Sequence, residues 1–93
     1  MEFEWDERKA AENLQKHGID FLDAIPIFLD PYRLEGEDER KEYGELRLKT
    51  IGMVAGRLLV VVYTLRQERI RMISARKAER YERRKYHEGD LES

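Results

Sequence analysis

Residues 57–74 read RLLVVVYTLRQERIRMIS, and this stretch decides the fold. Arg57 to Leu65 is apolar at nearly every position, which is typical of a central strand with both faces covered. The dipeptide at 67–68 indicates a turn. Arg69 to Ser74 then alternates, so its apolar side chains share one strand face and its arginines share the other. The stretch predicts an antiparallel hairpin at the centre of a sheet.

The residues before this hairpin predict further strands. Leu46 to Val54 has the composition of a strand, and Ala55-Gly56 is a tight turn that joins it to the central strand. Tyr32 to Glu35 is a short fourth strand candidate. Residues 36–45 between them are mostly charged and contain two glycines, so we expect an exposed loop there.

The N-terminal segment predicts a helix with clear boundaries. Phe3 and Trp5 alternate with acidic residues, which indicates a short edge strand or an extended lead-in. Asp6 can cap the helix that follows, because its carboxylate can accept from free backbone N–H groups. Lys16 and His17 fall in the last turn, and Gly18 supplies the left-handed residue that ends the helix.

A second helix is expected after Asp20, which is its candidate cap, and it ends at Asp30-Pro31. Pro26 lies inside it and removes a hydrogen bond, so we expect a kink or a start shifted towards Asp23. A closing helix is expected from about Arg76 to His87. Together the patterns predict one α+β domain over residues 1–93: two N-terminal helices, an antiparallel sheet of three or four strands and a C-terminal helix, with the helices on one sheet face.

Composition excludes several classes of function. The 93 residues contain no cysteine and two histidines, which argues against disulfides and against a structural zinc site. No glycine-rich loop that would cradle phosphates is present, and we expect no cofactor. The N-terminus lacks a signal-peptide pattern, and no apolar run is long enough to cross a bilayer, so we expect no membrane association and a cytoplasmic location.

Charge is divided unevenly along the chain. Residues 1–56 carry 8 basic and 14 acidic side chains, whereas residues 57–87 carry 10 basic and 3 acidic ones. This asymmetry indicates two surfaces with different partners, a cationic one for phosphate and an acidic one for something basic. The alternative is that the charges only keep a small domain soluble.

Three stretches resemble one known family over nearly the whole chain and in the same order: FEWDERKAAENLQKHGIDF, GELRLKTIG and VVVYTLRQERIRMISARKAERYERRKY. They are similar to the BrnT toxins of bacterial type II toxin–antitoxin systems. The resemblance implies a RelE-like fold, cleavage of RNA, and neutralisation by a BrnA antitoxin with a ribbon-helix-helix segment. It also implies that operator DNA is contacted only through the antitoxin, in a complex that is a dimer or hetero-oligomer.

Cleavage of RNA without a metal requires a base for the 2′-hydroxyl, cations for the charge that develops on phosphorus, and an acid for the leaving oxygen. Arginine suits the second role because its planar fork holds two phosphate oxygens. We expect arginines from separate elements to converge on one pocket. The candidate catalytic residues are Arg47, Tyr63, Arg66, Arg76 and His17. The candidate RNA-binding residues are Lys9, Arg69, Arg71 and Arg83.

Each candidate has an ordinary structural alternative. The arginines and Lys9 can be solvated surface residues, and His17 can simply favour the helix C-terminus as a cation. Tyr63 can stack on a base or transfer a proton if cations lower its pKa, or it can be a half-buried sheet tyrosine. Glu45 shares a strand face with Arg47, where it is better suited to orient the arginine than to act as a base.

Two other functions remain open on the sequence alone. The chain can be a nucleic-acid-binding or regulatory subunit that does no chemistry and acts only with its partner. It can also be a structural interaction domain whose basic stretch keeps the helix soluble. The sequence leaves the general base and the cleavage specificity undetermined.

Overall fold

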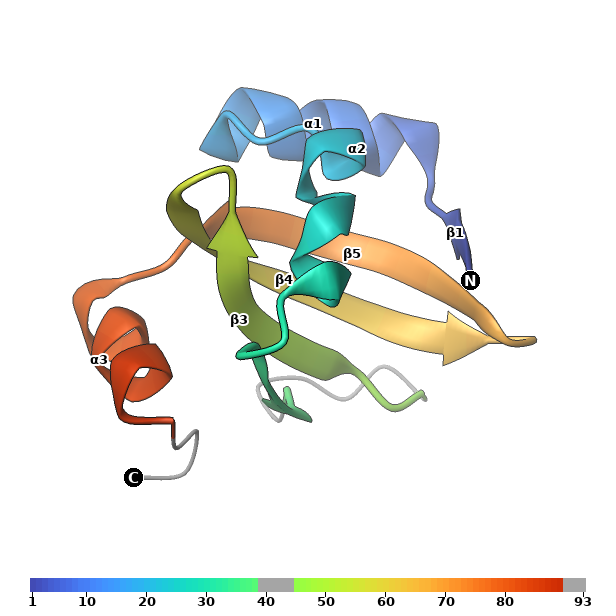
Figure 1. Ribbon diagram of the computed structural model, residues 1–93. Helices are drawn as coiled ribbons and strands as arrows, with labels where there is room; N and C mark the ends of the chain where they lie inside the picture. The colour runs from blue at the N-terminus through green and yellow to red at the C-terminus, as the bar shows by residue number, and fades with distance from the viewer. Residues whose placement is uncertain (39–44, 90–93) are drawn as a thin grey trace.

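A computed structural model describes residues 1–38 and 45–89 as a five-stranded sheet with helices on both of its faces (Figure 1). The strand order is β1-β5-β4-β3-β2. The elements, in chain order, are β1 (Glu2–Glu4), α1 (Glu7–His17), α2 (Phe21–Ala24), the 3₁₀ helix η1 (Ile25–Leu29), β2 (Leu34–Glu37), β3 (Leu48–Val54), β4 (Arg57–Arg66), β5 (Arg69–Lys77) and α3 (Arg80–Glu88).

The central position expected for β4 is confirmed. It pairs antiparallel with β3 on one side and with β5 on the other. Leu59, Val61 and Tyr63 point into one hydrophobic cluster, and Val60 points into a second cluster behind the sheet. Because successive strand side chains alternate between faces, an uninterrupted apolar run needs cover on both sides.

That requirement explains an error in the predicted arrangement, which placed all helices on one face. α1, α2 and η1 cover the first face, where Phe21 and Ile27 are fully buried. α3 closes the opposite face, where Ala78 and the partly buried Tyr86 pack with Ile51 and Val60. The fold class, α+β, is as predicted.

The sheet also contains more strands than predicted. β1 is a true strand that pairs parallel with the start of β5. Further along β5, α1 covers the edge: the side-chain amide of Asn13 donates to the carbonyl of Ala75 at 2.8 Å and its oxygen accepts from the Ala75 N–H at 3.1 Å. Asn13 therefore supplies the hydrogen bonds that a neighbouring strand would have made.

The N-terminal helix begins and ends as predicted. The Asp6 carboxylate accepts from the backbone N–H groups of Arg8 and Lys9, and Gly18 has φ 73° at the C-cap. The expected disturbance at Pro26 is also present, because α2 ends at Ala24 and the chain continues as η1. A proline in the first turn of η1 loses no helical hydrogen bond.

The predicted start of the closing helix at Arg76 is wrong. Arg76 belongs to β5, and the chain stays extended because the Ala78 N–H donates to the Leu58 carbonyl at 3.0 Å. The helix begins only after Glu79, which forms a capping box with Glu82.

Part of the expected loop at 36–45 also differs, because residues 36–37 belong to β2. Residues 39–44 lie outside the described part of the chain. In the described part, no helix has the length and apolar character needed to cross a bilayer.

Candidate functional site

One face of the sheet gathers basic side chains from three strands. In the register of β4 and β5, Arg66 lies opposite Arg69, Thr64 opposite Arg71 and Val60 opposite Arg76. These positions alternate with the core residues of the first face, so they point away from α1 and α2. We call this side the cationic face, and it comprises Lys49, Arg66, Arg69, Arg71 and Arg76.

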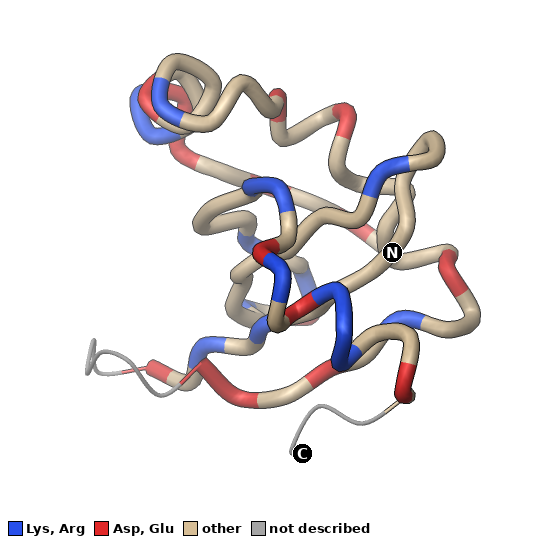
Figure 2. Tube along the Cα trace, turned by 90° about the vertical axis from the view of Figure 1, so that its left-hand side faces the viewer, with Lys and Arg blue, Asp and Glu red and all other residues tan. Residues whose placement is uncertain are grey.

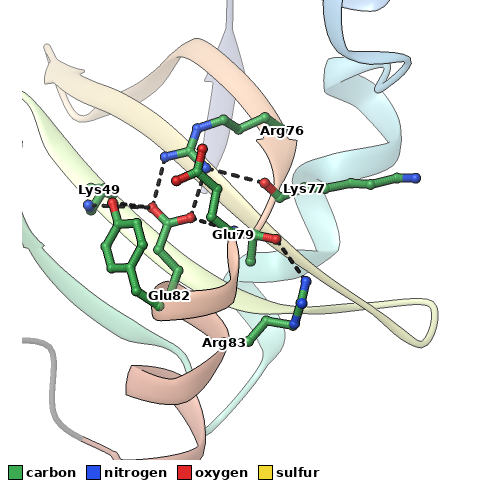
Figure 3. Close-up of polar contacts among 8 residues, drawn as sticks. Lys49, Arg76, Lys77, Glu79, Glu82 and Arg83 are labelled. Atoms are coloured by element: carbon green, nitrogen blue, oxygen red, sulfur yellow. Dashed lines mark hydrogen bonds and ion pairs between the residues drawn. The ribbon is translucent and has the colours of Figure 1, made fainter.

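The best-ordered part of the cationic face surrounds the carboxylate of Glu82 (Figure 3). Arg76 donates one hydrogen bond to each carboxylate oxygen, both at 2.8 Å. Lys49 approaches from β3, with its Nζ 3.7 Å from Oε2. The backbone N–H of Glu79 completes the group at 2.8 Å. Two strands and a helix thus meet at a single carboxylate.

The electrostatics of this group keep it ionised. Glu82 is fully buried, which alone would raise its pKa, but the hydrogen bonds from Arg76 and from the backbone of Glu79 outweigh burial and lower it. The hydrogen bonds that Arg76 donates to Glu82 raise the pKa of Arg76 in turn. Arg76 is therefore a permanently charged guanidinium in a fixed orientation, at a sheet position that is still partly open, with 19% of its side chain exposed.

The remaining cations of the face are paired with acidic residues. Arg69 contacts Glu2 at 3.0 Å, Arg71 contacts Glu4 at 3.2 Å, and Arg66 contacts Glu45 at 3.3 Å. Basic and acidic segments are accordingly interspersed along the chain in Figure 2. The side chains of Arg66 and Arg69 are both 50% exposed, so their ion pairs are open to competition from a solvent-borne anion.

His17 and Lys9 lie beside the cationic face. They line a hollow of about 230 Å³ between α1 and β5, together with Lys16 and Ser74. Ser74 pairs with Val62 on β4, so it shares its sheet face with Arg76. Burial lowers the pKa of His17, and the charges of Lys16 and Arg76 lower it further. At neutral pH the imidazole is therefore uncharged and able to accept a proton.

The structure does not bring Tyr63 to the arginines. Its ring lies on the opposite side of the sheet, in edge-on contact with Phe28, and its hydroxyl donates to Glu35. Burial and the hydrogen bond to Glu35 raise the pKa of Tyr63. The expected role in proton transfer required a lowered pKa.

The other candidates lie at the margin of the face. Arg47 immediately precedes β3, and Arg83 lies on α3, where it donates to the carbonyl of Ala78 at 3.1 Å. Glu45, which was expected to orient Arg47, pairs with Arg66 at 3.3 Å.

Sequence reasoning missed Lys49 and Glu82. The spacing of Arg47 and Lys49 on a strand places both on one face, and this signal would have identified the lysine. Glu82 has no such signal, because its contact with Arg76 depends on the turn at 78–79.

The described residues contain no group of three or more histidine, aspartate or glutamate side chains that could hold a metal ion.

Comparison with known proteins gives one informative result. Residues 5–82 match the model of the family described as "Ribonuclease toxin, BrnT, of type II toxin-antitoxin system". No curated protein matches the chain. The family match spans most of the sequence and contains Lys49, Arg76 and Glu82. On this basis the chain belongs to the BrnT family of ribonuclease toxins of type II toxin–antitoxin systems.

Proposed function

We propose that this chain cleaves RNA at the cationic face without a metal ion. The observation that carries the proposal is the arrangement of Arg76, which is held beside Lys49 on the strand face shared with Arg66, Arg69 and Arg71. A preorganised guanidinium costs no reorganisation when charge develops on a phosphate, which is the main source of electrostatic catalysis. Family membership gives the substrate class.

In the proposed reaction the 2′-oxygen of a ribose attacks the adjacent phosphorus while the bond from phosphorus to the 5′-oxygen breaks. The departing 5′-oxygen takes a proton from solvent water, so the products are a 2′,3′-cyclic phosphate and a free 5′-hydroxyl. Arg76 and Lys49 stabilise the additional negative charge on the phosphoryl oxygens. Glu82 is a positioning residue, because it orients both cations and does not need to touch RNA.

His17 is the proposed acceptor of the 2′-hydroxyl proton. Its lowered pKa leaves it neutral at pH 7, and the hollow that it lines reaches the cationic face at Ser74. Lys9 in the same hollow is a proposed phosphate contact. Arg66, Arg69 and Arg71 bind the flanking backbone by exchanging their carboxylate partners for phosphate. We do not assign Tyr63 a part in the chemistry.

The proposal extends to the partner. Type II membership implies an antitoxin protein. We propose that this antitoxin is a BrnA-like ribbon-helix-helix protein, that it neutralises the toxin in the cytoplasm by keeping RNA from the cationic face, and that it alone contacts operator DNA.

The test measures cleavage of end-labelled RNA in EDTA by the wild-type chain and by an Arg66→Ala, Arg76→Lys variant. Lysine keeps a positive charge beside Glu82 but lacks the two-pronged fork, so folding is retained while cleavage should fall at least 100-fold. Arg57→Ala, at the far end of β4, is the charge-matched control. If the wild type binds RNA but forms no 2′,3′-cyclic phosphate products, the result would favour the alternative function, in which the chain is a nucleic-acid-binding subunit that does no chemistry.

A further inference from the structure

A second surface lies between the two N-terminal helices, away from the cationic face. It is a groove of about 260 Å³ whose apolar lining comes from Trp5, Ala10, Ala11, Leu14 and Leu22. Leu14 is 47% exposed and Leu22 is 63% exposed, so the groove is open to solvent. The Trp5 ring at its floor stands edge-on against the buried Phe21, with centroids 5.9 Å apart. We call it the α1–α2 groove.

The charges around the groove have a single sign. Glu7 and Asp20 line it, and an adjoining hollow shares Trp5 and Glu7 and adds Glu4. No lysine or arginine lines either hollow among the described residues. The basic side chain of Lys9 on α1 faces the other way, into the hollow that contains His17. The groove thus combines an apolar floor with an acidic rim.

The size and the walls of the groove restrict its occupant. Small-molecule sites usually exceed about 300 Å³ and enclose their ligand, whereas this groove is smaller and open. Most of its lining residues belong to α1 and α2 and none belongs to a strand, so the groove itself offers no strand edge to which a peptide strand could add. The remaining mode of recognition is a helix that inserts apolar side chains spaced i, i+3, i+4 and i+7 between two helices.

We propose that the α1–α2 groove binds an amphipathic helix of the antitoxin, whose apolar side chains fill the groove and whose flanking lysines or arginines face Glu7 and Asp20. The name of the partner rests on the proposed function, but the chemistry of the helix rests on the groove alone. A second copy of this chain fits poorly, because the basic helix α3 is tied to its own sheet by Glu82 and by the Tyr86 hydroxyl, which donates to Asp30 at 2.7 Å.

The chain has one tryptophan, so its fluorescence reports directly on the groove. The probe is a tryptophan-free helical peptide with leucines at i, i+3, i+4 and i+7 and flanking lysines. It should shift Trp5 emission to shorter wavelength in a saturable titration that weakens with salt. The same peptide with glutamate in place of each lysine should cause no shift.

The test variant is Leu14→Gln, Leu22→Gln, which removes apolar area without changing charge and should weaken peptide binding about tenfold or more. Leu29→Gln is the matched control, since Leu29 is 82% exposed and lies outside the groove. In cells, the double variant should also escape neutralisation by co-expressed antitoxin while its RNA cleavage is unchanged.

Three results would overturn the proposal: equal binding of the lysine and glutamate peptides, binding that leaves Trp5 emission unaltered, or a shift produced by raising the concentration of the chain alone. The last result would identify a second copy as the occupant. If the wild type cleaves no RNA, the proposed function fails, but the fluorescence titration still tests the groove.

Discussion

Arg76 and Glu82 form a two-pronged ion pair that joins the end of β5 to the first turn of α3. The pair exists because β5 continues to Lys77 and the chain then turns sharply enough for the helix to face back onto the sheet. Glu82 also caps the helix through the N–H of Glu79. The residue that fixes the helix terminus therefore also fixes the arginine that we assign to phosphate.

Replacing the Glu82 carboxylate should destabilise the fold. Glu82→Gln leaves Arg76 and Lys49 beside a neutral group in a buried position, and breaking a buried pair from one side costs about 3 kcal/mol. Urea unfolding followed by circular dichroism measures the change. Glu37→Gln is the control, because Glu37 is exposed on the edge strand β2 and should alter stability by less than about 0.5 kcal/mol.

The same variant should change how stability depends on pH. The pKa of Glu82 in the folded chain lies below its ordinary value of 4.5, so the carboxylate contributes stability above that value and loses it as the pH falls through the folded pKa. The difference in unfolding free energy between the wild type and Glu82→Gln should be largest at neutral pH and should shrink as the pH falls below 4.5. A difference that stays constant from pH 7 to pH 3 would contradict this linkage.

Local signals in the sequence identified most elements. The caps at Asp6 and Gly18 and the apolar run of β4 are encoded within a few residues, so their positions were predictable. The location of α3 on the sheet face opposite α1 and α2 was not predictable. An uninterrupted apolar strand shows that both faces are covered, but it does not show which helix covers which face. The pairing of Asn13 with Ala75 was also hidden, since it joins residues 62 positions apart.

The candidate site was predictable to the same limited degree. Alternation in β5 places Arg69 and Arg71 together, and the hairpin register adds Arg66. The side of the sheet on which Tyr63 lies was knowable from the same alternation, because it is an odd number of positions from Arg66. The contact between Glu82 and Arg76 was not predictable, because it depends on the turn at 78–79 that brings α3 back to the sheet.

RNA binding should weaken steeply with salt if the cationic face contacts phosphates. Each neutralised phosphate of a single strand contributes about 0.7 to the slope of log affinity against log salt. Arg66→Ala and Arg69→Ala, both on half-exposed side chains, should each reduce that slope by about 0.7, whereas Arg57→Ala should leave it unchanged. Fluorescence anisotropy with a labelled, uncleavable 2′-deoxy oligonucleotide measures the slopes, and equal slopes for all three variants would remove these arginines from the interface.

The pH profile of cleavage should report His17. Burial, Lys16 and Arg76 hold its pKa below the ordinary value of 6.5, so the neutral base persists into mildly acidic solution. The rate should therefore fall only below pH 6.5, and His17→Gln should lower the plateau about 100-fold and abolish the acidic limb. An acidic limb that survives in His17→Gln would assign the base elsewhere, and a variant that loses stability with no change in rate would reduce His17 to a structural residue.

Removing the Asn13 amide should open the edge of β5 next to the proposed base. Asn13 is 7% exposed and bonds both backbone groups of Ala75 and the carbonyl of Ile19, so Asn13→Ala removes the side-chain partner of one backbone N–H and of two carbonyls. The cost should be about 3 kcal/mol, against little change for Gln15→Ala on the exposed side of α1. Amide hydrogen exchange gives a sharper readout, because the Ala75 N–H should lose its protection in Asn13→Ala and keep it in Gln15→Ala. If the Ala75 N–H stays protected from exchange in Asn13→Ala, another group must accept its hydrogen bond. The Asn13 side chain would then not be what protects the edge of β5.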